Sequence, residues 1–254
     1  MIIEANPDRA CGSVLVTGAA RGLGAAIAIA LAERGVEPIL LGRSAQSLAE
    51  TADAVGRISN LSPRLIAADV AAWDQLEAAL RGCIKDGERL WGVVNNAGII
   101  DPIALVEECD PVAFARCISI NLIGTFNVLR ACLPLLAESG IIANMSSGAA
   151  DAEHAGWSAY SASKAALERL SATLAAERPD LTVVAVRPGV TDTGMQQLIR
   201  DSSIDNAIKR LPREDLQPVN VPAREIARLF VETIAQPLDR SIEAKSINQY
   251  LQAK

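Results

Sequence analysis

The chain has 254 residues, with 24 basic and 30 acidic side chains, a formal net charge of −6 and a single histidine, His154. One histidine excludes zinc and iron sites built from several imidazoles unless cysteines or carboxylates supply the ligands, and we expect no metal site. The chain has no basic cluster and only 3 Trp, 2 Tyr and 3 Phe, which argues against a nucleic-acid partner because neutralising phosphates needs a basic face.

The cysteines, the N-terminus and the apolar runs indicate the compartment. The five cysteines are scattered and form no C-x-x-C pair, which is typical of reduced thiols in the cytoplasm. Residues 1–12 contain Glu4, Pro7 and Asp8 and no apolar run of the kind found in a signal sequence. No stretch approaches the roughly 20 uninterrupted apolar residues of a membrane span. We therefore expect a cytoplasmic protein with no membrane partner and a single domain over residues 1–254.

Short apolar runs alternate with longer segments of helical period along the chain, which is typical of βαβ units and a parallel sheet. Runs of Val, Ile, Leu and Ala predict strands at Ser13–Thr17, Glu37–Leu41, Arg64–Ala68, Trp91–Val94, Gly140–Met145 and Leu181–Val186. Because these runs lack polar alternation, helices should cover both faces of the sheet. The sequence therefore predicts an α/β fold with a doubly wound parallel sheet.

The segments between these strands carry apolar residues at helical spacing. In the first of them the apolar residues from Leu23 to Leu31 share one face, and Gly35 follows as a left-handed cap. Further helices are expected at Ser44–Val55, Ala72–Arg81, Pro111–Leu133, Trp157–Ala176 and Ala223–Ala235. The one long irregular segment, residues 191–221, is typical of a mobile flap over a binding site.

A glycine-rich turn with the sequence TGAARGLG follows the first strand at residues 17–24. Gly18 lets the chain turn, Gly22 lets the backbone approach a pyrophosphate, and Gly24 allows the helix to pack closely on the strand. The exposed N–H groups and the positive end of the helix would then face the anion. This pattern predicts a dinucleotide site, with a turn that serves packing alone as the alternative.

The end of the second strand indicates which nicotinamide cofactor is bound. A site for an unphosphorylated ribose would place Asp or Glu there, whereas this chain has Gly42-Arg43-Ser44. A guanidinium can pair with a 2′-phosphate through two charge-assisted bonds, and Arg21 could add a second positive charge. We therefore expect NADP(H) rather than NAD(H), with solvated surface arginines as the alternative. Asp69 either accepts from an adenine amino group or caps the next helix.

Tyr160 and Lys164 lie four residues apart in an expected helix, so they share a face. A tyrosine, with an ordinary pKa of about 10, acts as an acid or base near neutrality only if its phenolate is stabilised. Lowering the pKa to about 7 requires roughly 4 kcal/mol, which a desolvated Lys164 together with a nicotinamide cation could supply. Ser147 ends the fifth strand, where its hydroxyl can hydrogen-bond a substrate carbonyl. In isolation, such a tyrosine–lysine pair is more often a surface pairing.

Together these features resemble the short-chain dehydrogenase/reductase family over nearly the whole chain. The resemblance is carried by TGAARGLG at residues 17–24, Asp69-Val70, Asn95-Asn-Ala-Gly98, Asn121, Ser147, Tyr160, Lys164 and Arg187-Pro-Gly189. It implies a seven-stranded Rossmann fold with Tyr160 as general acid/base, Ser147 orienting the carbonyl and Lys164 holding the nicotinamide ribose. It also implies that Asn121 anchors a water that relays protons through Lys164, and a helix-interior amide is the alternative.

The resemblance further implies the cofactor contacts and the assembly. Asn95 to Gly98 would stabilise the sheet and line the adenine side, and Val190 and Thr193 would hold the carboxamide. The cofactor-binding residues are expected to be Gly18, Arg21, Gly22, Leu23, Gly24, Arg43, Asp69, Val70, Asn95, Ala97, Gly98, Tyr160, Lys164, Pro188, Gly189, Val190 and Thr193. Relatives usually pair through the helices expected at Pro111–Leu133 and Trp157–Ala176, so a homodimer or homotetramer is expected.

The segment from Asp192 to Arg200 is similar to the sepiapterin reductase and benzil reductase branch of the family, whose members reduce compact 1,2-diketones or a pteridine side-chain ketone with NADPH. This likeness implies an NADPH-dependent carbonyl reductase acting on a small ketone or 1,2-diketone. By location, the pocket candidates are His154, Trp157, Met195 and Gln196. His154 is not expected to be catalytic because Tyr160 already provides the acid.

Three points stay open. The enzyme could work in the oxidative direction as an NADP-dependent alcohol dehydrogenase. The chain could also be a non-catalytic NADP(H) sensor, since a fold alone does not fix a function. The segment Leu238–Tyr250 lacks the paired glycines of many relatives, so the seventh strand is the least secure of the expected elements.

Overall fold

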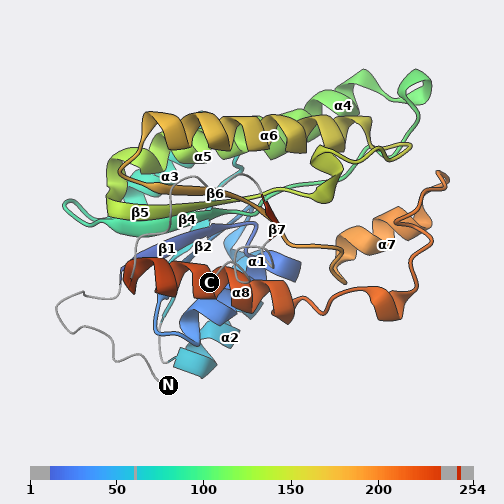
Figure 1. Cartoon of the computed structure of the whole chain (residues 1–254). Helices are drawn as coiled ribbons and strands as arrows, with labels where there is room; N and C mark the ends of the chain where they lie inside the picture. The colour runs from blue at the N-terminus through green and yellow to red at the C-terminus, as the bar shows by residue number, and fades with distance from the viewer. Residues whose placement is uncertain (1–11, 60–61, 236–244, 247–254) are drawn as a thin grey trace.

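The computed structural model of the chain describes residues 12–59, 62–235 and 245–246 (Figure 1). Within these residues the strands form one seven-stranded parallel sheet in the order β3-β2-β1-β4-β5-β6-β7. The strands are β1 (Ser13–Thr17), β2 (Glu37–Gly42), β3 (Leu65–Ala67), β4 (Leu90–Asn95), β5 (Leu136–Met145), β6 (Thr182–Arg187) and β7 (Lys245–Ser246). The strand order reverses between β1 and β4, and ligands of such sheets bind beyond the carboxyl ends of the strands at that point.

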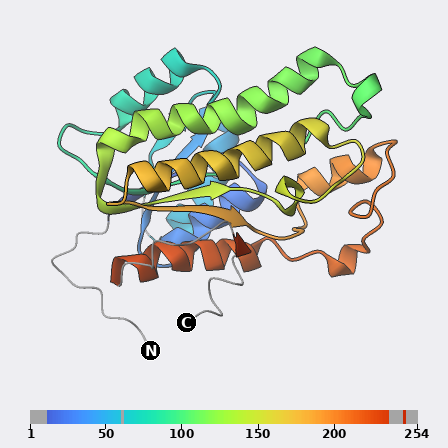
Figure 2. The same ribbon diagram turned by 45° about the horizontal axis from the view of Figure 1, so that its top comes forward.

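Helices cover both faces of the sheet, as Figures 1 and 2 show from two directions. One face carries α1 (Gly22–Ala32), α2 (Ala45–Ser59) and α8 (Asn220–Ala235). The other carries α3 (Trp73–Cys83), α4 (Pro111–Ile118), α5 (Gly124–Cys132) and α6 (Ser158–Glu177). Strand β1 shows why both layers are needed, because Val14 and Val16 pack with the first layer and Leu15 with the second. The expected doubly wound α/β fold is therefore confirmed.

The structure corrects the prediction for residues 191–221 and contains the expected seventh strand. Within residues 191–221, expected to be irregular, the chain forms α7 (Gly194–Asp201) and a short 3-10 turn at Arg213–Asp215, so that expectation was wrong there. Helix α7 has only 8 residues, and although Met195, Leu198 and Ile199 recur at helical spacing, a segment this short is difficult to identify as a helix from its period alone. The seventh strand is present at Lys245–Ser246, and the rest of Leu238–Tyr250 lies outside the described residues.

The expected helix at Pro111–Leu133 is continuous to Leu135 but changes its winding. Between α4 and α5 lies a π-helical turn, Ser119–Ile123, and the last turn, Leu133–Leu135, is 3-10. Among the described residues this is the one helix that is long and apolar enough to cross a membrane, judged by length and composition only. It is a core helix of this fold, since Val128, Leu129 and Cys132 pack in the hydrophobic core beneath it.

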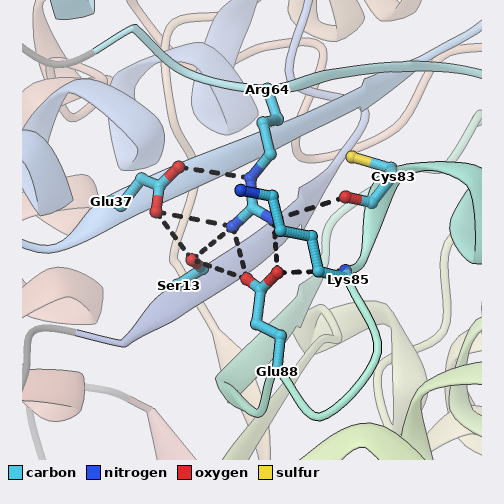
Figure 3. A network of polar contacts seen from close by, with 6 residues as sticks. All are labelled: Ser13, Glu37, Arg64, Cys83, Lys85 and Glu88. Atoms are coloured by element: carbon cyan, nitrogen blue, oxygen red, sulfur yellow. Dashed lines mark hydrogen bonds and ion pairs between the residues drawn. The ribbon is translucent and has the colours of Figure 1, made fainter.

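A polar network closes the sheet at the amino ends of its strands (Figure 3). Arg64, just before β3, donates from Nη1 and Nη2 to the two carboxylate oxygens of Glu88 at 2.8 and 2.7 Å, and from Nε to Glu37 at 3.2 Å. It also donates to the Ser13 hydroxyl at 2.6 Å, and the Arg64 hydrogen bond lowers the pKa of Glu88. The network ties the starts of β1, β2 and β3 to the loop before β4, at the edge of the sheet opposite the strand ends that carry the predicted site.

Candidate active site

The glycine turn is shaped by contacts that no side chain larger than hydrogen would allow. Gly18 has φ +64°, and a Cβ on Gly24 would lie 2.3 Å from the carbonyl oxygen of Gly18. Asn96 holds the turn from the neighbouring strand end, because its Nδ2 donates to the carbonyl oxygens of Thr17 and Gly18 at 3.1 and 3.3 Å. Sequence reasoning missed this role of Asn96, although the residue lies inside the Asn95-Asn-Ala-Gly98 motif.

The surroundings of the turn fit a dinucleotide phosphate. Helix α1 begins at Gly22 with no side-chain cap on its first N–H groups. Gly22 has φ +58°, and among the described residues only Thr193 would lie within 4 Å of a Cβ placed there. Arg21 and Arg43 are exposed, and within the described part of the chain neither guanidinium has an ion-pair partner. Open N–H donors beside two uncommitted positive charges are the chemistry that a phosphorylated dinucleotide requires.

The residues expected on the adenine side divide into two groups. Asp69 accepts a hydrogen bond from the Ala71 N–H at 2.9 Å, so one carboxylate oxygen orders the turn that leads into α3. The carbonyl of Val70 accepts from Asn127 at 3.0 Å. Asn95 is buried, and its Nδ2 donates to Asn144 on β5 at 2.8 Å. The Asn95 side chain thus cross-links the sheet, whereas Asp69 and Val70 stay at the strand ends where a ligand would lie.

Asn121 lies in the π-helical turn and joins three segments of the site. Its Oδ1 accepts from the Ile99 N–H at 2.8 Å, and its Nδ2 donates to the Ile99 carbonyl at 2.8 Å and to Ser163 Oγ at 3.0 Å. A Cβ on Gly98 would lie 3.2 Å from Asn121 Oδ1 and 3.7 Å from Lys164 Nζ. Asn121 therefore fixes the loop after β4 beside Lys164, and its amide is engaged with neighbouring segments rather than only within its own helix.

Ser147, Tyr160 and Lys164 come together as the sequence predicts. Ser147 follows β5, its Oγ accepts from the Ala149 N–H at 3.2 Å, and its hydroxyl lies close enough to Tyr160 on α6 to lower the pKa of that side chain. Lys164 is buried, lies 5.6 Å from the centre of the Tyr160 ring and donates from Nζ to the Met145 carbonyl at 2.7 Å. A buried, cationic side chain aligned with a tyrosine is costly to maintain, which marks the cluster as a functional site.

The electrostatics show what the chain supplies by itself. Burial raises the pKa of Tyr160, and the hydrogen bond with Ser147 lowers it by less. Burial lowers the pKa of Lys164 to about 8. The net effect on the pKa of Tyr160 is thus opposite to the lowering that the sequence predicts, because desolvation outweighs the contribution of Ser147 and the lysine is not among the groups that shift it. Lowering the pKa of Tyr160 therefore requires a further positive charge, which a nicotinamide cation would supply.

Tyr160 belongs to an apolar cluster that brings together most of the predicted pocket. The Trp157 ring packs edge to face against the Tyr160 ring, with ring centres 5.8 Å apart. The His154 ring contacts Trp157, with ring centres 4.6 Å apart. Met195 and Ile199 of α7 pack against the same cluster. Gln196, which follows Met195 in α7, is also buried, and its Oε1 has no hydrogen-bond partner among the described residues. Such a wall suits a compact, largely apolar substrate.

The segment after β6 carries the remaining predicted cofactor residues, which are Pro188, Gly189, Val190 and Thr193. Gln217 pins this segment, because its N–H donates to the Val190 carbonyl and its carbonyl accepts from the Asp192 N–H, both at 2.9 Å. Thr193 then starts α7 and lies across from the glycine turn, close to Gly22. Sequence reasoning missed Gln217, since nothing in its local pattern points to a partner so far along the chain. Among the described residues no group of three or more potential metal ligands occurs.

Comparisons with known proteins agree with this geometry. The family model described as short chain dehydrogenase matches residues 13–203. An NADPH-dependent pterin aldehyde reductase of Arabidopsis thaliana is 35% identical over 173 residues, which is 67% of this chain and 71% of that protein. The benzil reductase ((S)-benzoin forming) of Saccharomyces cerevisiae is 30% identical over 178 residues, 64% of each chain. A short chain dehydrogenase of Monascus purpureus is 36% identical over 166 residues, but the match spans only 57% of its length.

Solved structures agree with the fold over more of the chain. The enzyme KRED1-Pglu superposes with a TM-score of 0.81 at 29% identity, over 90% of this chain and 98% of that one. A short chain dehydrogenase from Shigella flexneri, crystallised with NADP, gives a TM-score of 0.77 at 28% identity, over 93% and 94%. With the family model matched from the first strand through α7, and with the fold and the tyrosine–lysine pair in place, the chain belongs to the short-chain dehydrogenase family, whose members are oxidoreductases.

Proposed function

We propose that the protein is an NADPH-dependent carbonyl reductase that converts a small ketone or 1,2-diketone into an alcohol. The observation that carries the proposal is the placement of Tyr160 near Ser147 and buried Lys164, within an apolar cluster at the carboxyl ends of the strands. When bound, the nicotinamide supplies a hydride to the carbonyl carbon. Tyr160 donates its proton to the carbonyl oxygen.

The roles of the other residues follow from their positions. Ser147 reaches the Tyr160 hydroxyl, so a carbonyl oxygen placed between them would accept from both hydroxyl groups. Lys164 favours loss of the Tyr160 proton, because a positive charge 5.6 Å from the ring centre stabilises the phenolate that is left behind. Asn121 holds the Ile99 segment against this lysine. Its further proposed role is to anchor the water that relays protons through Lys164. The glycine turn and Arg21 and Arg43 bind the pyrophosphate and the 2′-phosphate.

Two relatives support the choice of reaction and cofactor. One carries the name of an NADPH-dependent pterin aldehyde reductase and the other that of a benzil reductase, so both are described as reducing carbonyl groups. The absence of a carboxylate in Gly42-Arg43-Ser44 favours NADPH for this chain as well. The apolar cluster around Trp157 and Met195 favours a substrate with an aromatic or cyclic flank.

The purified protein should oxidise NADPH when given 1,2-diketones such as benzil, and should do so faster than it oxidises NADH. Loss of the reduced nicotinamide absorbance on a panel of diketones, simple ketones and aldehydes measures this. Oxidation of the matching alcohols with NADP⁺ at a higher kcat/KM would assign the oxidative direction instead. Binding of NADPH without turnover of any carbonyl or alcohol would contradict the reductase and favour a sensor.

The expected assembly, the single domain over residues 1–254 and the cytoplasmic compartment stay predictions. The helices through which relatives pair expose large apolar side chains in this chain, among them Val112, Ile123 and Phe126. Such side chains favour the proposed homodimer or homotetramer.

A further inference from the structure

A second polar network lies directly behind the proposed catalytic residues. Arg187, the last residue of β6, donates from Nε and Nη2 to the two carboxylate oxygens of Glu168 on α6, each at 2.7 Å. Its Nη1 donates to Asp151 at 2.7 Å. The Ser146 hydroxyl donates to the same Glu168 carboxylate at 2.7 Å. Arg187 and Glu168 are 21% and 17% exposed, so water screens this pair only in part.

The network joins the segments that carry Ser147, Tyr160 and Lys164. Glu168 lies one helical turn after Lys164 on α6. Ser146 immediately precedes Ser147, and its N–H donates to the Val186 carbonyl at 2.7 Å. Asp151 ends the short turn that Ser147 begins. The ends of β5 and β6, the turn after β5 and helix α6 are therefore held to one another through a single guanidinium.

This arrangement matters because the site depends on contacts between those same segments. Lys164 reaches back to the Met145 carbonyl, and Tyr160 reaches across to Ser147. A slide or rotation of α6 relative to the end of β5 would break both contacts together. A bidentate guanidinium–carboxylate pair has a fixed planar geometry, so it resists such a movement better than apolar packing does.

We propose that Arg187 and Glu168 are positioning residues, which set α6 against the end of β5 so that Tyr160 meets Ser147 and Lys164 meets Met145. The inference rests on the proposed reductase function for its kinetic consequences but not for its geometric ones. Neither residue is assigned a contact with substrate or cofactor. A displacement of about 1 Å in a reacting group can cost about 100-fold in rate, which sets the expected scale.

The test compares two variants with a matched control. Arg187→Lys keeps the charge but cannot bridge Glu168 and Asp151 with a planar fork, and Glu168→Gln keeps the size but loses the charge. The control is Arg64→Lys, which weakens a bidentate arginine–glutamate pair of similar exposure, 24% and 22%, at the opposite edge of the sheet. Thermal unfolding reports the loss of stability in all three variants, and steady-state kinetics with NADPH and benzil reports kcat and KM separately.

A second readout needs no substrate. The chain has 2 tyrosines, so in a Tyr250→Phe background the absorbance titration of tyrosine reports Tyr160 alone. The titratable groups that face Tyr160 are Lys164 on its own helix and Cys117 on α4. Burial is the main cause of the raised pKa of Tyr160, so loosening α6 should hydrate the hydroxyl and move its pKa down towards the ordinary value of about 10.

Arg187→Lys and Glu168→Gln should lower kcat by about 10- to 100-fold with KM changed less than about threefold, and should lower the pKa of Tyr160, whereas Arg64→Lys should change only the melting temperature. If both variants melt earlier but keep the wild-type kcat and tyrosine titration, the network is merely structural and the inference is wrong. If the wild-type protein reduces no carbonyl, the proposed function fails, and the tyrosine titration alone decides the inference.

Discussion

Replacing Tyr160 with phenylalanine is expected to lower kcat by about 10²- to 10⁴-fold while leaving the affinity for NADPH nearly unchanged. The Tyr160 hydroxyl is an acidic proton that the structure places near Ser147 within the apolar cluster. Phenylalanine keeps the ring that packs edge to face on Trp157, so the pocket should retain its shape. Only the proton donor is removed.

The measurement is steady-state reduction of benzil by the variant, with NADPH binding followed by quenching of protein fluorescence. Tyr250→Phe is the matched control, because it removes the other of the chain's 2 tyrosines and should leave kcat at the wild-type level. Turnover by Tyr160→Phe within a few-fold of wild type would show that another group protonates the carbonyl oxygen. A parallel loss of NADPH binding would instead point to a collapse of the site.

Changing Arg43 to aspartate should reverse the cofactor preference. The substitution removes a guanidinium beside the expected 2′-phosphate and adds a repelling charge, and hydrogen bonds to charged groups contribute about 1.5–3 kcal/mol. We expect the affinity for NADPH to fall by about 10- to 100-fold, while that for NADH is unchanged or improved because aspartate can accept from the ribose hydroxyls. Arg43 is exposed, so the fold should tolerate the change.

Dissociation constants for both cofactors, measured with the Arg43→Asp protein, check this expectation. Arg57→Asp makes the same change of charge at an exposed position in the last turn of α2, far along the helix from residue 43, and serves as the control. A ratio of NADPH to NADH affinity that stays constant in Arg43→Asp would exclude Arg43 from phosphate recognition. An equal loss in both variants would indicate a long-range effect of net charge.

Local patterns were sufficient to predict the elements that position the site. Strand Ser13–Thr17 has the predicted bounds because a run of apolar residues ends at a glycine turn, and both signals lie within a few residues. The pairing of Tyr160 with Lys164 is equally local, because a helix brings residues four apart onto one face. The position of Ser147 in the site could be predicted because the carboxyl ends of parallel strands lie at a common edge of the sheet.

The features that sequence reasoning missed depend on contacts between distant segments. Asn96, at the end of β4, hydrogen-bonds the glycine turn that follows β1. Gln217 hydrogen-bonds Val190 and Asp192, which lie more than 20 residues before it in the chain. Arg187 belongs to a predicted motif, but its bond to Glu168 exists only once α6 lies on β6. The direction of the pKa shift of Tyr160 also could not be predicted from the motif, because burial depends on how distant segments pack around the site.

The central claim is that the site moves a hydride from nicotinamide to a carbonyl carbon while Tyr160 supplies the proton. Reduction of benzil with NADPH deuterated at nicotinamide C4, followed by mass spectrometry of the alcohol, tests it most directly. We predict that one C4-deuterated epimer of NADPH yields benzoin with deuterium on the new carbinol carbon, and that Tyr160→Phe makes the same product far more slowly. Alcohol without deuterium from either epimer, or no alcohol at all from any carbonyl tried, would contradict the account.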